Sequence, residues 1–341
     1  MKYLVVLLSL SISLHLHAQL TRGDIKHPDF ADSITWSQKK KDKLTDFVLD
    51  KLTRALIVYH NGKRVYQYGD TQKPYMVFSM RKSIISLIYG IYVEKGTINL
   101  QSTLAEMKLD DKAGLSAEEK NARIIDLLKA RSGVYHKAAF ETNAMVRERP
   151  ERGVFKRDEH WYYNNWDFNA LVTIFENHTG KSLFQAFAED LANPLGMSFD
   201  ISIQKYHYEE VSEHPATLWY FTAEDLALLG QLLLSKGEWN GEQLVSSEWI
   251  TESTVPYSDC GIRGAYGYCW WVAEEGFLLP FVNVPDGTYA AQGTGQQSLI
   301  IIPEWELMIV HQTEVKSPDD PRMKVTDFGK MLKIILEQSW F

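Results

Sequence analysis

The chain has little cysteine and no excess of basic residues, and each shortage excludes a class of protein. Only two cysteines, Cys260 and Cys269, occur among 341 residues, too few for a disulfide-rich scaffold. They cannot form a metal site alone, and no pair of histidines has the spacing of a zinc motif. With 36 Lys and Arg against 44 Asp and Glu, the formal net charge is −8. Proteins that bind nucleic acid usually carry a basic face, so the sequence predicts neither a metal nor a nucleic-acid partner.

Long uncharged apolar runs are also missing after the first nineteen residues. The first nineteen residues themselves differ: Lys2 precedes an apolar stretch over Leu4–Leu14, and Leu16-His17-Ala18 offers a cleavage site after Ala18. This pattern predicts a secretory signal peptide at residues 1–18 and an exported chain, periplasmic or secreted. An N-terminal membrane anchor is the alternative, but the run is shorter than the ~20 residues that a span needs. The mature chain is expected to have no membrane span. Export would permit a disulfide between the two cysteines; the alternative, two unpaired residues with Cys269 in a strand core, stays open.

Strand patterns occupy both ends of the chain, and helical patterns occupy the middle. Two β-rich runs, 55–60 and 63–68, flank Asn61-Gly62, a strong signal for a two-residue hairpin turn. Apolar spacing predicts a helix over 79–95. Further helices are expected at 37–52, 124–130, 166–178, 222–235 and 323–340, and further strands at 268–272, 297–302 and 306–312.

This order predicts an α/β (α+β) fold in which one antiparallel sheet is flanked by helices. Residues 19–75 and 240–341 are expected to form the sheet domain, and residues 76–239 an inserted all-helical domain. In the last segment, Val325, Phe328, Leu332 and Ile335 are expected to share one apolar face. A cleft between the two domains is the expected position of a site.

The first candidate tract for chemistry is Ser79-Met80-Arg81-Lys82. A serine hydroxyl needs a base within hydrogen-bond distance before it can attack a carbonyl. Residues three apart share a helical face, so Lys82 can serve Ser79. Burial would lower the lysine pKa and free its lone pair. A second Ser-x-x-Lys, at Ser37 and Lys40, lies in a lysine-rich stretch expected to stay in water. The alternative for Ser79 is an ordinary helix N-cap.

The second tract is Tyr163-Asn164-Asn165. A tyrosine hydroxyl near Lys82 could relay a proton to a leaving group, and Asn165 could hold Lys82 or a substrate carbonyl. Tyr162 offers a second Tyr-x-Asn frame one residue earlier. The alternative interpretation is an aromatic packing cluster.

The third tract, Ala291-Gln292-Gly293-Thr294-Gly295, precedes a buried strand. Its small residues would let a substrate approach the backbone, which makes Ala291, Gln292 and Gly293 candidate substrate-binding residues. The amides of Ser79 and Thr294 could then stabilise an oxyanion. A β-bulge or a turn is the alternative.

In order and spacing, the three tracts resemble the serine β-lactamase and penicillin-binding-protein family. The resemblance extends over Ser79–Asp111, Ile125–Gly133, Tyr163–Met197 and Ala291–Pro303. It is closest to class C β-lactamases, their esterase relatives and 6-aminohexanoate-oligomer hydrolases. The resemblance implies Ser79 as nucleophile, Lys82 as base, Tyr163 rather than Tyr162 as proton relay, and no metal or organic cofactor.

One departure concerns the third motif, which in the family is usually Lys-Thr-Gly or His-x-Gly and here reads Ala-Gln-Gly. Ala291 cannot grip a substrate carboxylate, so neutral esters or linear amides are expected. Basic residues at 147–157 are expected either to replace that charge as a rim or, more simply, to form a solvated loop.

The sequence therefore predicts an exported serine hydrolase that forms an acyl-enzyme with a small-molecule ester or amide. A β-lactamase or D-alanyl-D-alanine carboxypeptidase is the first alternative, and a non-catalytic binding module on the same fold is the second. The sequence leaves the oligomeric state open.

Overall fold

The computed structural model of the chain describes residues 34–316 and 320–337. The expected signal peptide, residues 1–18, lies outside the described residues. Within the described part, no helix is long and apolar enough to cross a membrane.

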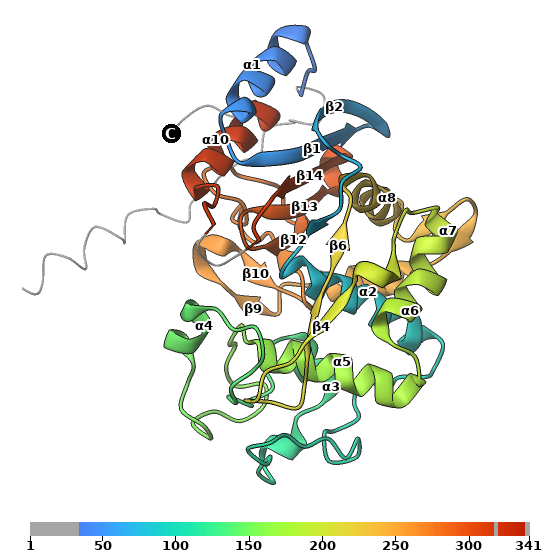
Figure 1. Cartoon of the computed structure of the whole chain (residues 1–341), viewed down its shortest axis with the longest axis vertical. Coiled ribbons are helices and arrows are strands. Elements are labelled where there is room, and N and C mark those ends of the chain that lie inside the picture. The colour runs from blue at the N-terminus through green and yellow to red at the C-terminus, as the bar shows by residue number, and fades with distance from the viewer. Residues whose placement is uncertain (1–33, 317–319, 338–341) are drawn as a thin grey trace, which may run out of the picture.

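A large antiparallel sheet occupies the upper part of the molecule (Figure 1). The first long strand of the chain pairs with the last one, and the two lie next to each other near one edge of the sheet. This arrangement confirms the predicted fold class. Among the described residues the strands of this sheet are, in pairing order, β2 (Lys63–Gly69), β1 (Thr53–His60), β14 (Leu307–Thr313), β13 (Gln297–Ile302), β12 (Tyr289–Gly293), β11 (Trp271–Val272), β10 (Ala265–Tyr266) and β9 (Ser258–Asp259).

The β1–β2 hairpin turns at the predicted position. Asn61 and Gly62 have φ angles of 50° and 68°, and a two-residue hairpin turn of this hand needs positive φ at both positions. Asparagine and glycine are the residues that reach this region most readily, so the local sequence determines the turn.

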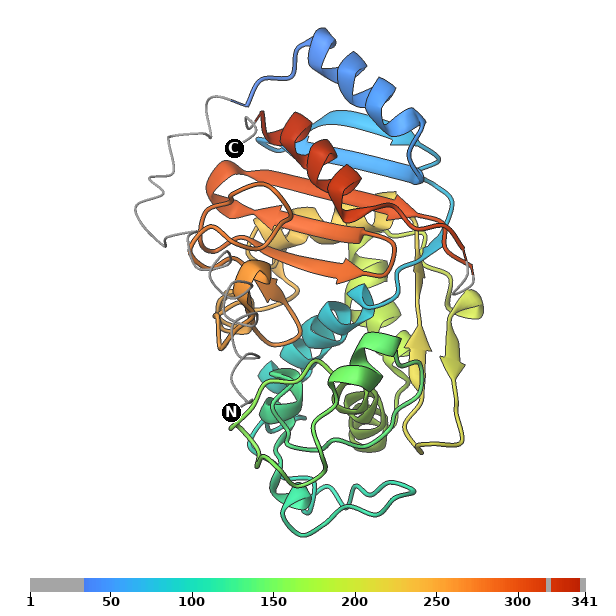
Figure 2. The ribbon, with the colours of Figure 1, turned by 90° about the vertical axis from the view of Figure 1, so that its left-hand side faces the viewer.

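Helices cover both faces of the sheet. The terminal helices α1 (Gln38–Leu49) and α10 (Val325–Leu336) pack side by side above one face (Figure 2). Helix α8 (Ala223–Leu234) packs against β13 and β14, although it lies inside the segment expected as the helical domain. Its approach is close, since a Cβ on Gly230 would lie 1.8 Å from Met308 Sδ.

Helices of the central segment form the lower part of the molecule. Figure 2 shows α2 (Met80–Glu94) running between these helices and the sheet, and α2 contacts both. The other helical elements are η1 (Glu119–Asn121), α3 (Ile124–Leu128), α4 (Asn143–Glu148), α5 (Asn165–Thr179), α6 (Leu183–Phe187), η2 (Ala188–Ala192), α7 (Asn193–Leu195), η3 (Ile201–Ile203), α9 (Ser247–Ser253), η4 (Gly261–Arg263) and η5 (Pro303–Trp305). The short paired strands are β3 (Tyr75–Met76) with β6 (Tyr220–Phe221), β4 (Lys205–His207) with β5 (Ala216–Leu218), and β7 (Glu238–Trp239) with β8 (Glu242–Gln243).

The prediction of a strand at 268–272 is wrong for residues 268–270, because β11 covers only Trp271–Val272. Tyr266 and Trp271 pair across a tight turn, in which Cys269 has a φ of 62°. The amide of Cys269 donates to Leu128 O at 2.9 Å rather than to a neighbouring strand. Cys269 is therefore not in a strand core, and it is not bonded to Cys260, since both cysteines are free.

Two smaller expectations also fail. Val325 is 51% exposed, so the buried face of α10 consists of other residues, including Phe328, Leu332 and Ile335. Lys40 is not in water: its side chain is buried, and its ammonium lies 3.0 Å from Glu337 Oε1. Ser37 caps α1 by accepting from the Lys40 amide, so this Ser-x-x-Lys is a helix start.

Candidate active site

Ser79 stands at the start of α2, but its side chain makes no capping hydrogen bond. The preceding residue, Phe78, has a φ of 49°, a conformation that bulky residues rarely adopt and that costs energy. The hydroxyl is therefore available to another partner. That partner is Lys82, whose Nζ lies 3.0 Å from Ser79 Oγ.

Tyr163 completes the contact predicted from the sequence. Its hydroxyl lies 2.8 Å from Lys82 Nζ, although the two residues come from different parts of the chain. Asn164 caps α5 by accepting from the Asp167 amide, which fixes Tyr163 just ahead of the helix. The neighbouring Tyr162 donates to Met145 O at 2.6 Å instead. The structure thus brings together Ser79, Lys82 and Tyr163, and not the alternative tyrosine.

Burial sets the protonation states of these groups. The Lys82 side chain is 1% exposed, and burial lowers its pKa well below the ordinary value, with the nearby Arg81 charge lowering it further. Burial raises the pKa of Tyr163 to about 12, although the hydrogen bond with Ser79 opposes the rise. A buried lysine that readily becomes neutral beside a tyrosine that keeps its proton can serve as a base and an acid.

Sequence reasoning missed Arg81 as part of this site. The side chain is 2% exposed, its Nη2 donates to Asn169 Oδ1 at 3.0 Å, and Nη1 has no partner among the described residues. Burial lowers its pKa to about 10, so it stays positive at neutral pH. The sequence feature that could have indicated its role was a second charged residue beside Lys82 in a largely apolar helix.

The third tract meets the segment that leads to Ser79. A Cβ on Gly293 would lie 2.3 Å from Val77 O, and Gln297 Nε2 donates to Met76 O at 3.0 Å. Within the described part of the chain, the amides of Ser79 and Thr294 have no acceptor. Two free N–H groups next to a serine hydroxyl are what an oxyanion requires.

The three candidate substrate-binding residues of this tract occupy β12. Ala291 is 2% exposed and pairs with Leu299, while Gln292 and Gly293 are half-buried. The strand therefore offers backbone rather than a charged side chain beside Ser79.

Asn165 hydrogen-bonds to the backbone of a neighbouring loop. Its Nδ2 donates to Ala139 O at 3.3 Å and to Phe140 O at 2.5 Å. Its Oδ1 is buried without a partner among the described residues. Phe140 in turn stacks on Phe78, with ring centroids 6.3 Å apart, so Asn165 holds the loop that flanks the residue before Ser79.

Tyr163 also belongs to an aromatic cluster, so both interpretations of its tract hold. Its ring centroid lies 5.3 Å from that of Trp271, 5.7 Å from Tyr266 and 6.4 Å from Trp161. Trp166 lies elsewhere and donates to Asp111 Oδ2 at 2.7 Å.

The basic stretch at 147–157 is exposed over most of its length, as expected for a solvated loop, but its arginines are paired rather than free. Arg147 pairs with its neighbour Glu148, and the other three arginines pair with carboxylates outside the stretch. The pairs are Arg147–Glu148 at 2.9 Å, Arg149–Glu141 at 2.5 Å, Arg152–Glu119 at 2.6 Å and Arg157–Asp126 at 3.6 Å.

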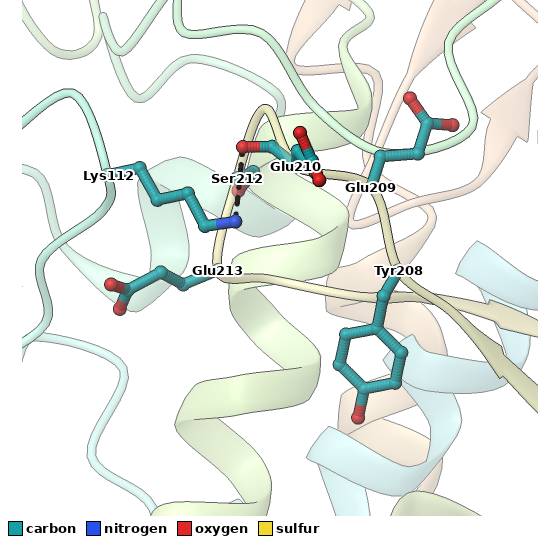
Figure 3. A pocket seen from close by; sticks show the side chains of 6 residues that line it. All are labelled: Lys112, Tyr208, Glu209, Glu210, Ser212 and Glu213. Atoms are coloured by element: carbon teal, nitrogen blue, oxygen red, sulfur yellow. Dashed lines mark hydrogen bonds between the residues drawn. The ribbon is translucent and has the colours of Figure 1, made fainter.

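A surface cavity of about 410 Å³ lies away from these residues, near the tip of the β4–β5 hairpin (Figure 3). Glutamates dominate its lining, and Lys112 reaches across to donate to Glu210 O at 3.1 Å, while Tyr208 points away from that contact. Among the described residues, no cluster of His, Cys, Asp or Glu could hold a metal ion. The groups in mutual contact that can take part in proton transfer are Ser79, Lys82 and Tyr163.

Several solved structures resemble the fold of this chain. A candidate 6-aminohexanoate-dimer hydrolase from Bacillus anthracis has a similar structure, with a TM-score of 0.65 and 21% identity over 86% of this chain and 81% of that chain. A penicillin-binding protein from Bacillus halodurans gives 0.62 and 15% over 85% and 99%. EstCE1, a hydrolase with promiscuous acyltransferase activity, gives 0.61 and 15% over 91% and 98%.

These likenesses show the fold, which is of the β-lactamase and transpeptidase type. Comparison with curated proteins gave no match. The family model for beta-lactamase matches residues 49–327, a span that includes all three tracts. The chain belongs to the beta-lactamase family, and it is a serine hydrolase.

Proposed function

We propose that the chain is an exported hydrolase that cleaves esters or linear amides through an acyl-enzyme on Ser79. The observation that supports this most directly is the contact of three side chains, with Lys82 Nζ 3.0 Å from Ser79 Oγ and 2.8 Å from Tyr163 Oη. Export rests on the N-terminal sequence, and a mature N-terminus at Gln19, determined by N-terminal sequencing of the protein from its producing cells, would test it.

In the proposed acylation step, neutral Lys82 accepts the proton of Ser79 while Oγ attacks the substrate carbonyl carbon. The amides of Ser79 and Thr294 stabilise the oxyanion, each contributing about 3 kcal/mol of barrier lowering. Tyr163 gives its proton to the leaving oxygen or nitrogen and recovers one from Lys82. The bond between the carbonyl carbon and the leaving group then breaks.

Deacylation follows the same path in reverse, with water in place of the leaving group. Tyr163 and Lys82 remove the water proton as the oxygen attacks the acyl carbon. Ser79 leaves as the alcohol after it regains its proton from Lys82. No step needs an organic cofactor.

The substrate class follows from β12. Its Ala291 is small, uncharged and 2% exposed, so residue 291 offers a substrate carboxylate no charged partner. This favours neutral esters and linear amides over β-lactams and D-alanyl peptides, which present a carboxylate there in the family.

A fluorophosphonate probe with intact-mass detection tests the nucleophile. We expect one adduct on the wild type, none on Ser79→Ala, and much slower labelling of Tyr163→Phe. Tyr162→Phe is the matched control, since its hydroxyl contacts Met145 O, and it should label like the wild type. An adduct that survives Ser79→Ala would refute the assignment. A panel of nitrophenyl esters, dipeptide amides and a chromogenic cephalosporin then identifies the substrate class, and preferred turnover of the cephalosporin would contradict the proposed one.

A further inference from the structure

A second cavity, of about 390 Å³, lies where α1 packs against α10. The chain as a whole carries a formal net charge of −8, but the lining of this cavity is basic. Four lysines line it together with one carboxylate: Lys39, Lys40, Lys43, Lys333 and Glu337. Positive charge is therefore concentrated at one place on an acidic protein.

Two of these lysines are buried, although burial is costly for a charged ammonium group. The side chains of Lys40 and Lys333 are each 7% exposed. Lys40 Nζ donates to Thr35 O at 2.9 Å and lies 3.0 Å from Glu337 Oε1. Burial lowers the pKa of Lys40, and the contact with Glu337 opposes the shift. A further anion in the cavity would stabilise the charged form of this lysine.

The other two lysines, Lys39 and Lys43, lie on α1 and are exposed. They are four residues apart, so their like charges are neighbours on the helix surface and repel each other. Neither lysine has a carboxylate partner within residues 34–316 and 320–337. Asp42 lies between them in the sequence, but its carboxylate accepts from Gln38 Nε2 at 2.8 Å. A bound anion would relieve the repulsion between the two lysines.

The charges in this cavity suit a phosphate better than a carboxylate. Four ammonium groups against one carboxylate leave more positive charge than a monocarboxylate can neutralise. A phosphate monoester carries about 1.5 to 2 negative charges at neutral pH. Arginine is the residue that binds carboxylates in a planar, paired geometry, whereas lysine binds phosphate as a point charge. The described residues that line the cavity include lysines and no arginine.

We propose that the cavity between α1 and α10 binds a phosphate group, carried either by a soluble phosphate ester or by an anionic lipid headgroup. Lys39 and Lys43 contact the phosphate from α1, and Lys40 and Lys333 add the charge of two buried ammonium groups. Glu337 competes with the ligand, because its carboxylate already contacts Lys40.

This phosphate site is separate from the reaction centre. Figure 2 shows α1 and α10 above the sheet, and α2, which follows Ser79, below it. The inference therefore stands or falls independently of the proposed function.

The experiment measures phosphate binding at constant ionic strength, so that general screening of charge does not change. Isothermal titration calorimetry follows inorganic phosphate and glycerol 3-phosphate, and co-sedimentation follows phosphatidylcholine vesicles with and without phosphatidic acid. We expect Lys43→Met to weaken binding roughly tenfold or more, as on loss of a hydrogen bond to a charged group. Adding Lys39→Met should weaken it further. Glu337→Gln removes the competing carboxylate and should strengthen binding.

Lys41→Met is the matched control. Lys41 lies on the same helix, but it does not line the cavity, so this variant should keep the wild-type affinity. A loss in Lys43→Met alone, seen with the soluble phosphates or only with the phosphatidic acid vesicles, supports the site and identifies the source of the phosphate. Equal affinities of Lys41→Met and Lys43→Met would overturn the inference, because they would indicate diffuse attraction at most. Failure of the wild type to bind any of the phosphate probes would overturn it as well.

Discussion

Gly293 lies so close to Val77 that a Cβ on residue 293 would come within 2.3 Å of the Val77 carbonyl oxygen. Real Cβ atoms do not approach a backbone oxygen to that distance, so only glycine permits the contact. The contact matters because Thr294 follows Gly293 and Ser79 follows Val77 by two residues. The close packing of two backbones thus sets the distance between the two free amides.

Gly293→Ala should therefore impair catalysis more than folding. The added methyl must push β12 away from the turn before Ser79 and separate the amide pair. We expect kcat to fall roughly 10²- to 10³-fold, as on loss of one oxyanion donor. The measurement is kcat per labelled active site, together with thermal unfolding.

Gly230→Ala is the matched control for that change. Its Cβ would meet Met308 Sδ at 1.8 Å, so overpacking should cost about 1–3 kcal/mol of stability. It lies on α8, and the labelled fraction of this variant should keep its kcat. Equal kcat values for Gly293→Ala and the wild type would show that the amide spacing is not what limits the reaction.

Arg81 should control the pH range of activity through Lys82. Lys82 must be neutral to act, so kcat/KM rises with pH through the pKa of this lysine. Burial lowers that pKa, and the Arg81 charge lowers it further. Arg81→Met removes a like charge, raises the pKa of Lys82 and moves the acid limb of the kcat/KM profile to higher pH. Arg81→Lys keeps the charge and should leave the limb in place. If the acid limb of the kcat/KM profile does not move in a folded Arg81→Met protein, Arg81 does not set the pKa of Lys82.

Asp167 should make stability depend on pH in an unusual direction. Burial raises its pKa to about 8, against about 3.9 in an unfolded chain. Between these values the folded state holds a proton that the unfolded state has lost. The contribution of Asp167 to stability is thus complete below pH ~4 and is lost as the pH rises toward 8. Asp167→Asn cannot titrate, so its Tm relative to the wild type should increase from pH 5 to 8 and level off above. Parallel Tm curves for the two proteins would exclude a buried neutral carboxyl.

Arg152 should stabilise the fold, although it lies in a stretch that resembles a solvated loop. Its guanidinium contacts both oxygens of Glu119, at 2.8 and 2.6 Å, and the Glu119 side chain is 4% exposed. Arg152→Ala leaves that carboxylate buried with one partner fewer. Because Arg152 is itself 43% exposed, we expect a loss of about 1–3 kcal/mol rather than the larger cost of a fully buried pair.

Arg147→Ala is the natural comparison. The Arg147–Glu148 pair is 72% and 64% exposed, and solvent-exposed pairs contribute little. Urea unfolding should show a change below about 0.5 kcal/mol for this variant. Similar losses of unfolding free energy in Arg152→Ala and Arg147→Ala would show that the contact with Glu119 does not stabilise the fold more than an exposed pair does.

The sequence was sufficient to predict those elements whose conformation depends only on neighbouring residues. Asn61-Gly62 determined a hairpin turn, and the apolar spacing after Ser79 determined α2. The contact between Ser79 and Lys82 followed from helical geometry, whereas their contact with Tyr163 followed from resemblance. The strand expected at 268–272 failed because a tight turn at Cys269 interrupts it, and apolar residues in such a turn look the same as apolar residues in a strand.

Other features could not be predicted because they depend on partners distant in sequence. From the sequence, Arg152 is expected to be solvated, but in the structure it pairs with Glu119. Lys40 is likewise expected to be exposed, but Glu337, at the end of the last described helix, pairs with it.

The pairing of β1 with β14 has a consequence for how the molecule is made. β1 leaves the ribosome long before β14, yet β1 has β14 as one of its two neighbours in the sheet. Until β14 has been synthesised, one side of β1 has no partner, and an unpaired strand edge invites association with other chains. Loss of even a short piece that includes β14 should thus leave a chain unable to complete its central layer.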